Sequence, residues 1–243
     1  MSEIFDSDYL VQSFKNMNIN LSSKQVNQFV DYYNLLIEWN SFMNLTSITK
    51  WEDVVIKHFV DSVSLSMFSK EMTQASVSLI DVGTGAGFPG VPLKIVFPQI
   101  KITLLDSLKK RIGFLDEVVS SLCLSDVSTI HGRAEDIGRM KEHREQYDFC
   151  VSRAVANLST LSEICLPFVK VGGQFISYKS EKADEEVVSS SNAIKLLGGN
   201  LKSVEKFVLS GSEFNRAFVF IDKVEKVSNR FPRKAGTPGK EPL

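Results

Sequence analysis

The feature that most constrains this chain is a glycine-rich segment at positions 81–90, with the sequence Asp-Val-Gly-Thr-Gly-Ala-Gly-Phe-Pro-Gly. It follows a short apolar run, Ser78–Val82, and precedes an apolar segment long enough for a helix, Val91–Phe97. Glycine lets a backbone turn tightly and approach a ligand with no Cβ in the way. One glycine suffices for a plain strand-to-helix turn. The GxGxG pattern formed by Gly83, Gly85 and Gly87 therefore favours a ligand-binding loop.

Short apolar runs alternate with helical segments from position 78 onward. The predicted strands are Ser78–Val82, Lys101–Asp106, Val127–His131, Tyr147–Val151 and Gln174–Tyr178. The helices predicted between them are Val91–Phe97, Lys109–Leu122 and Leu158–Val169. This alternation is typical of βαβ units, and it predicts an α/β fold whose parallel sheet is covered on both faces.

The last part of the chain breaks this alternation. After a predicted helix near Lys182–Leu197, the runs Leu201–Leu209 and Arg216–Asp222 are joined by a turn-rich segment, Ser210–Asn215. Two strands joined so closely form an antiparallel pair. We therefore predict a seven-stranded, mostly parallel sheet that ends in an antiparallel hairpin. Such a sheet differs from the simplest dinucleotide-binding fold.

The N-terminal part has a helical pattern. Apolar residues recur at helical spacing on both sides of a polar segment, Asn40–Thr49, which is predicted to be a loop. His58 and Asp61 lie three apart on one predicted helix face. They are either polar groups of the functional site or a pair with satisfied hydrogen bonds that holds these helices to the sheet. The predicted division is a helical extension (1–70), a cofactor-binding α/β domain (71–225) and a basic C-terminal tail (226–243).

Composition excludes several classes of protein. Charged residues are 23% of the chain and hydrophobic residues 43%, which is typical of a globular protein and not of a disordered one. No apolar stretch approaches the ~20 residues of a membrane span, and the acidic start has no signal-peptide pattern. The three cysteines, Cys123, Cys150 and Cys165, form no CxxC pair. We therefore expect no metal site and a reducing cytoplasmic location. We also expect a monomer.

Charge is unevenly distributed, although the formal net charge is only −1. Residues 223–243 hold six Lys or Arg against two Asp or Glu. A basic tail of this kind is either a local phosphate-binding patch or a solvated, partly disordered terminus. Charge alone leaves both interpretations open.

Residues beyond the loop narrow the choice of ligand. The NAD pattern GxGxxG requires glycine at position 88, where this chain has Phe88. Asp106 ends the next strand, where an acidic residue can accept hydrogen bonds from both ribose hydroxyls of NAD or of S-adenosylmethionine. The GxGxG form and the terminal hairpin favour S-adenosylmethionine as the cofactor. Asp106 alone is also explained as a helix cap, since Ser107 and a basic turn follow it.

Two further segments follow predicted strands and are therefore expected at the ligand crevice. After the third strand, the backbone amides of Ala134 and Glu135 can meet an adenine edge, or this segment is only a surface turn. After the fourth strand comes Arg153, at the place where methyl transfer is expected. Arg153 can hold a phosphate or a base, or it can pair with a carboxylate such as Glu135.

These motifs together resemble one known family. The matching segments are Trp39-Asn40, Asn44–Thr46, His58–Ser62, Val82–Leu93, Leu105–Arg111, Gly132–Glu135, Ser152–Ala156 and Phe231–Leu243. The chain resembles ribosomal RNA small subunit methyltransferase G, also called glucose-inhibited division protein B, from about Trp39 to the end and in the same order. Ser180 after Lys179, and Gln174 after a glycine pair, depart from the small residues expected there, outside the cofactor motifs.

The resemblance implies a class I, Rossmann-like methyltransferase that transfers a methyl group from S-adenosylmethionine to N7 of one guanine in small-subunit (16S) ribosomal RNA. The partner is then this RNA, within the small subunit or an assembly intermediate. The predicted cofactor-binding residues are Gly83, Gly85, Gly87, Phe88, Asp106, Ser107, Ala134, Glu135 and Arg153, and Arg153 is also the predicted catalytic, positioning residue. The residues predicted to hold RNA are Lys109, Lys110, Arg111, Arg133, Lys179, Arg230, Arg233 and Lys234.

The implied reaction requires no general base from the protein. Guanine N7 carries an in-plane lone pair and no proton, so it can attack a sulfonium methyl in line without a general base. We therefore expect the rate to come from alignment. The alternatives are a methyltransferase for a small molecule or protein, an NAD-dependent oxidoreductase, and a non-catalytic binding module. Phe88 disfavours the second, and the intact loop with Asp106 disfavours the third.

Overall fold

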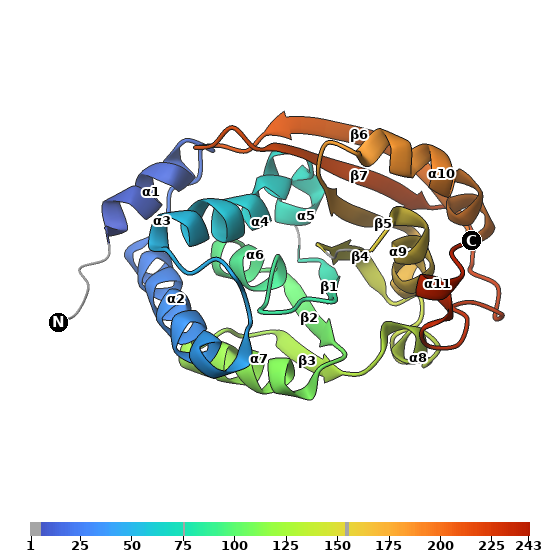
Figure 1. The fold of residues 1–243 in the computed structure, drawn as a ribbon, viewed down its shortest axis with the longest axis horizontal. Coiled ribbons are helices and arrows are strands. Elements are labelled where there is room, and N and C mark those ends of the chain that lie inside the picture. Colours follow the sequence, from blue (N-terminus) through green and yellow to red (C-terminus); the bar gives the residue numbers. More distant parts are fainter. Residues whose placement is uncertain (1–5, 75, 154–155) are drawn as a thin grey trace.

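The computed structural model describes residues 6–74, 76–153 and 156–243. Its centre is a seven-stranded sheet with the strand order β3-β2-β1-β4-β5-β7-β6 (Figure 1). The strands are β1 (Ser78–Val82), β2 (Lys101–Asp106), β3 (Val127–His131), β4 (Tyr147–Ser152), β5 (Val169–Lys179), β6 (Gly199–Val208) and β7 (Asn215–Lys223). Strands β1 to β5 pair in parallel, and β7 pairs antiparallel with β5 and β6. The predicted sheet, with its terminal hairpin, is confirmed.

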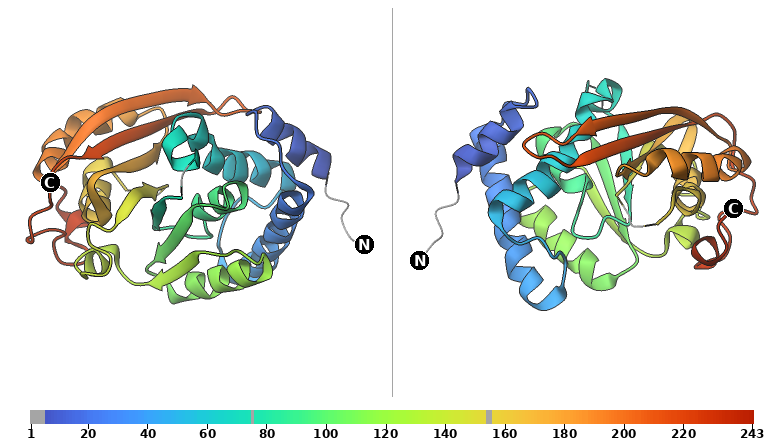
Figure 2. Two further views of the ribbon diagram at one scale, coloured as in Figure 1. Left: turned by 180° about the vertical axis from the view of Figure 1, so that it is seen from behind. Right: turned by 45° about the horizontal axis from the view of Figure 1, so that its top comes forward.

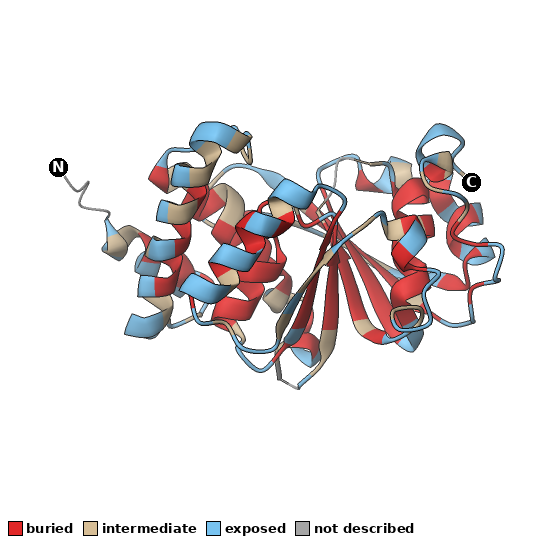
Figure 3. Cartoon of the chain, turned by 90° about the horizontal axis from the view of Figure 1, so that it is seen from below, coloured by how far each residue is buried: buried red, intermediate tan, exposed pale blue. Residues whose placement is uncertain are grey.

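Helices cover both faces of the sheet, which lies between them in Figure 3. They are α1 (Ser7–Lys15), α2 (Ser23–Met43), α3 (Trp51–Val54), a π-helical segment (Val55–Val60), α4 (Asp61–Val63), α5 (Lys70–Gln74), α6 (Gly90–Val96), α7 (Lys109–Ser121), α8 (Ala134–Ile137), α9 (Leu158–Cys165), α10 (Ala183–Leu196) and α11 (Thr237–Lys240). Successive strand residues face opposite sides. Leu79 belongs to the core that α1 to α4, α6 and α7 share, whereas Ile80 belongs to the core that α8 to α10 share.

Two predicted boundaries are wrong for local reasons. The first four residues of the predicted loop, 40–43, continue α2, because nothing among them breaks a helix before Asn44, whose left-handed φ of 51° ends it. The helix predicted over Leu158–Val169 ends at Cys165. Pro167 cannot continue an α-helix, so a short 3-10 turn follows and Val169 already begins β5.

The N-terminal helices are packed firmly against the sheet domain. α2 begins at Ser22, whose side chain forms a capping box with Gln25. The Gln28 amide donates a hydrogen bond of 2.8 Å to the Leu122 carbonyl at the end of α7. Figures 1 and 2 also show the tip of the β6–β7 hairpin reaching these helices. The N-terminal layer thus shares its core with the face of the sheet that it covers.

The C-terminal segment is folded back onto the protein. Val227, Phe231 and Pro238 are buried. Arg144 donates hydrogen bonds to the carbonyl oxygens of Val227 and Phe231, at 2.8 and 2.9 Å. The interpretation of this segment as a solvated terminus is therefore wrong. The segment is basic overall, but it also contains apolar residues that become buried when it packs against the rest of the protein.

Candidate active site

A cleft of about 730 Å³ opens at the carboxyl ends of β1 to β4. This is the topological switch point of the sheet, because β2 and β4 lie on opposite sides of β1. The predicted cofactor residues that line the cleft are Gly83, Gly85, Phe88, Asp106, Ser107, Ala134, Glu135 and Arg153. Four segments that are distant in the sequence thus meet at one place, in a volume typical of small-molecule sites.

The glycine loop depends on backbone conformations that other residues rarely adopt. Gly83, Gly85 and Gly87 have φ angles of 73°, 62° and 98°. A Cβ on Gly85 would meet nothing within 4 Å, so this cleft-lining residue leaves open space beside the loop. A Cβ on Gly87 would lie 2.7 Å from the Tyr32 hydroxyl oxygen. Packing against α2 therefore accounts for Gly87, and a cofactor contact there stays a prediction.

Asp81, at the end of β1, holds the loop from inside. Its Oδ2 accepts hydrogen bonds from the Thr84 hydroxyl at 2.6 Å and from the Gly90 amide at 2.8 Å. Its Oδ1 is buried without a partner among the described residues. Burial raises the pKa of this carboxyl to about 6, against the opposing effect of those two bonds. Asp81 was not among the predicted site residues, although its position directly before the glycines was a signal for this role.

Asp106 connects the loop to the start of α7. Its side chain accepts hydrogen bonds from the amides of Gly85, at 3.0 Å, and Leu108, at 2.9 Å. Arg111 lies 3.3 Å from the same carboxylate. The bond to Leu108 supports the helix-start interpretation, and the bond to Gly85 ties the residue to the glycine loop. A carboxylate has about four acceptor positions, so Asp106 can still accept a ligand hydroxyl.

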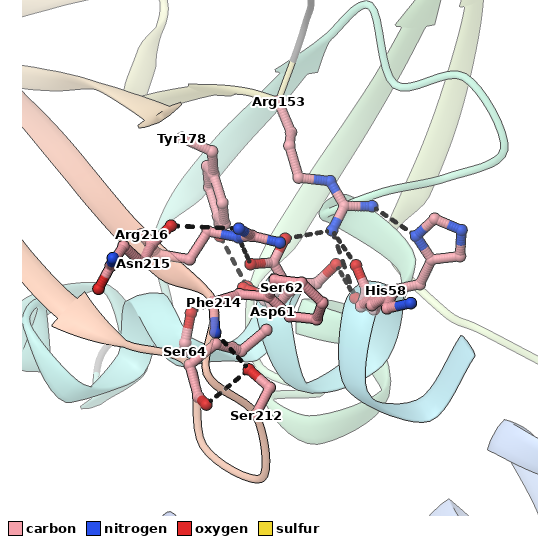
Figure 4. Close-up of polar contacts among 12 residues, drawn as sticks. His58, Asp61, Ser62, Ser64, Arg153, Tyr178, Ser212, Phe214, Asn215 and Arg216 are labelled. Carbon is pink, nitrogen blue, oxygen red and sulfur yellow. Dashed lines mark hydrogen bonds and ion pairs between the residues drawn. The ribbon is translucent and has the colours of Figure 1, made fainter. Parts of the chain in front are cut away.

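Arg153, directly after β4, is held by the N-terminal layer (Figure 4). Its Nη1 lies 2.8 Å from Asp61 Oδ2, and its guanidinium carbon lies 5.1 Å from the centre of the Phe88 ring. Glu135 is not its partner, so that predicted pair is wrong. Glu135 Oε1 instead accepts a hydrogen bond of 2.8 Å from the Gly236 amide. Ala154 and Val155, which belong to the same sequence motif, lie outside the described residues.

His58 completes the polar wall beside Arg153. The imidazole stacks on Phe88 with 4.4 Å between ring centres, and its Nε2 lies 2.9 Å from the Thr46 hydroxyl. Burial, together with the nearby positive charge of Arg153, lowers the pKa of His58 to about 3. Of the two interpretations of His58 and Asp61, the structure supports a satisfied group that holds the helices to the sheet. It also places that group on the cleft.

The C-terminal segment contributes to the same cleft, which the sequence did not predict. Gly236 and Gly239 line it on the side of α8 and α9. The segment is fixed there by Arg233, which makes a bidentate ion pair with the buried Glu163 at 2.7 to 3.1 Å. The Thr160 hydroxyl also donates to the Pro238 carbonyl at 2.9 Å. The two glycines of the segment were a signal for close approach of the backbone.

The residues predicted to hold RNA fall into two groups. Lys109, Lys110, Arg133, Arg230 and Lys234 are exposed, and Arg111 is partly exposed. Lys179 and Arg233 are occupied within the protein, by Glu186 at 2.7 Å and by Glu163 respectively. RNA binding by either group stays a prediction. Among the described residues there is no cluster of His, Cys, Asp or Glu that could hold a metal ion. The described helices include none long and apolar enough to cross a membrane.

Comparison with known proteins agrees with this architecture. The family model for rRNA small subunit methyltransferase G matches residues 25–219. A protein named ribosomal RNA small subunit methyltransferase G from Staphylococcus carnosus is 49% identical over 237 residues, which are 97% of this chain and 98% of that protein. A protein of the same name from Staphylococcus aureus strain Newman is 50% identical over 236 residues, again 97% of this chain and 98% of that one.

Solved structures support the fold independently of close sequence similarity. The crystal structure of a SAM-dependent methyltransferase from Aquifex aeolicus has a TM-score of 0.52 and 20% identity, over 70% of this chain and 93% of that one. The fold is therefore that of class I methyltransferases, as predicted. With the family model matching most of its length and relatives at about half identity, this chain belongs to the rRNA small subunit methyltransferase G family.

Proposed function

We propose that this chain transfers a methyl group from S-adenosylmethionine to N7 of one guanine in small-subunit (16S) ribosomal RNA. The observation that carries the proposal is the cleft at the switch point, where the GxGxG loop, Asp106 and Arg153 meet in a member of this family. When bound, S-adenosylmethionine supplies an electrophilic methyl group on its sulfonium sulfur.

The residues of the cleft fit this cofactor. Asp106 stands at the end of β2, where a carboxylate suits ribose hydroxyls. The open space beside Gly85 allows a close approach of the backbone. Ala134 and Glu135, after β3, have backbone groups suited to an adenine edge. We assign the cofactor to these residues together with Gly83, Phe88, Ser107 and Arg153, which line the same cleft.

The chemistry then requires alignment more than proton transfer. Guanine N7 attacks with its own lone pair, so no side chain has to remove a proton. His58 is unsuited to act as a base in any case, because its pKa near 3 makes it a very weak one. Holding the two reacting groups in line can supply about 7–11 kcal/mol of the barrier reduction. Arg153, restrained from several sides, is the residue best placed to hold a group of the substrate or cofactor in that alignment.

The RNA is expected to meet the basic residues around the cleft. Lys109, Lys110 and Arg111 lie in the first turn of α7, where the helix dipole disfavours positive charge. A bound phosphate would compensate this unfavourable position. We propose the small subunit or an assembly intermediate as the substrate, a monomeric enzyme and a cytoplasmic location. The division into segments 1–70, 71–225 and 226–243 also stays a proposal.

The test is the transfer of labelled methyl from S-adenosylmethionine to small subunits whose RNA comes from a strain lacking this protein. Nucleoside analysis should place the label in N7-methylguanosine at one position. The variant Asp106→Ala should lose transfer, whereas Glu142→Gln, which changes an exposed carboxylate, should keep it. Label in a protein or a small molecule instead of RNA would favour the alternative acceptor and refute the proposal.

A further inference from the structure

Asp61 is a buried carboxylate that joins three distant parts of the chain (Figure 4). It is the first residue of α4 in the N-terminal layer and is 4% exposed. Its Oδ2 pairs with Arg153 Nη1 and its Oδ1 with Arg216 Nε, both at 2.8 Å. Arg153 follows β4, and Arg216 is near the start of β7. One side chain therefore connects the N-terminal helices, the methyl-transfer end of β4 and the terminal hairpin.

We propose that Asp61 is a positioning residue for methyl transfer, which acts by fixing the guanidinium of Arg153 in the wall of the cleft. This inference rests on the function proposed above. It identifies the residue that fixes the alignment of the reacting groups. Arg153 lines both the 730 Å³ cleft and an adjoining cavity of about 350 Å³. Its guanidinium therefore borders the space for the cofactor and a second space open to an acceptor.

The other contacts of Arg153 restrain it but do not replace Asp61. Nη1 also faces the carbonyl oxygens of Lys57 and His58, at 3.4 and 3.5 Å, and Nη2 faces His58 Nδ1 at 3.4 Å. These distances are long for hydrogen bonds. The 2.8 Å contact with a carboxylate is the short, charge-assisted one and dominates the orientation. The pKa of His58, lowered by burial to about 3, leaves the imidazole neutral near pH 7, so it adds no competing charge.

A purely structural role leaves the position of Arg153 on the wall of the cleft unexplained. Burying charged groups is costly, and well-packed apolar residues usually join elements of a fold at least as well as a buried ion pair. Within this group, Asp61 balances one of the two guanidinium charges and the neutral His58 adds none, so one positive charge is left uncompensated. Such an arrangement is useful where one guanidinium must keep a defined direction toward a ligand. Tyr178 fixes the neighbouring backbone, since its hydroxyl donates to the Ser62 carbonyl at 2.6 Å.

The test compares Asp61→Asn with the wild-type protein in methyl transfer to small subunits. We expect kcat to fall roughly 10- to 100-fold, the cost of a misplaced group in an alignment-driven reaction. The dissociation constant of S-adenosylmethionine, measured by calorimetry, should change less than about 3-fold. In an Arg153→Ala background, Asp61→Asn should lower kcat no further, because its effect passes through Arg153.

The matched control is Asp148→Asn, at the amino end of β4 and therefore opposite the cleft, which weakens the ion pair with Lys170 and the 2.9 and 2.7 Å hydrogen bonds from the Ser78 amide and hydroxyl. It should lose thermal stability but keep kcat. A folded Asp61→Asn variant with wild-type kcat, or effects that multiply with those of Arg153→Ala, would overturn the inference.

If Asp61→Asn does not fold, Asp61→Glu is used, since it keeps the charge but displaces it. Its folded form should lose at least about 3-fold in kcat, and wild-type kcat would likewise refute the inference. A wild-type protein without transfer to RNA would instead refute the proposed function itself.

Discussion

Removing the Glu163 carboxylate should release the C-terminal segment from the cofactor cleft. Glu163 is fully buried on α9 and accepts hydrogen bonds from the backbone amide and the guanidinium of Arg233. Breaking a buried ion pair costs about 3–5 kcal/mol. The Arg233 side chain is 26% exposed and keeps a 2.6 Å bond to the Glu241 carbonyl. We therefore expect Glu163→Ala to cost about 3 kcal/mol, or roughly 100-fold in the docking equilibrium of the segment.

Hydrogen exchange of individual amides is the direct assay. The Gly236 amide, which donates to Glu135, should exchange roughly 100-fold faster in Glu163→Ala, while amides of β1 keep their rates. The affinity for S-adenosylmethionine should fall as well, because Gly236 and Gly239 line the cleft, but by no more than the docking energy that is lost. Unchanged exchange at Gly236, or equal acceleration in β1, would refute the argument that this ion pair holds the segment locally.

Three further measurements test the cleft. Gly90→Ala should cost about 1–3 kcal/mol in urea unfolding, because its Cβ would lie 2.4 Å from Cδ2 of the buried Leu104 and 3.0 Å from Asp81 Oδ2. Gly113→Ala, on open helix surface, should be neutral or stabilising. Burial raises the pKa of Asp81 from the ordinary value of 3.8 to about 6 in the folded protein. As pH rises from 3.8 to 6, the carboxyl ionises in the unfolded chain but stays protonated in the folded protein, so the free energy of unfolding falls. The wild type should lose about 2 kcal/mol relative to Asp81→Asn between pH 4 and pH 7, and a pH-independent difference would contradict this. His58 ring signals in NMR should show neutral imidazole down to about pH 4, and titration near pH 6.5 would contradict the burial argument.

The sheet and the glycine loop were predictable because their signals are local. Each strand is a short apolar run that ends at a turn signal, and the alternation with helices specifies parallel pairing. The position of the loop between Val82 and Val91 follows from the same order. Asp106 could be singled out because the carboxyl ends of parallel strands meet at one edge of the sheet. These inferences use only neighbours in the chain and one rule of topology.

The partners of the charged residues were not predictable in the same way. Arg153 pairs with a carboxylate 92 positions earlier, and Arg233 with one 70 positions earlier. Such pairs depend on how whole layers pack, and several acidic residues in the sequence were equally suitable candidates. For Arg153 the predicted candidate, Glu135, was the wrong one. For the C-terminal segment, the count of charges suggested exposure, although Glu163 neutralises Arg233 from within the core.

The N-terminal helices therefore do more than cover the sheet. The Tyr32 hydroxyl donates to the Ala86 carbonyl in the glycine loop, and His58 stacks on Phe88. Asp61 from the same layer holds Arg153 at the end of β4. The loop and the arginine that border the cleft thus take their positions partly from residues outside the α/β unit. A cleft assembled in this way couples cofactor geometry to the packing of the helical layer, so changes in that layer act on alignment as well as on stability.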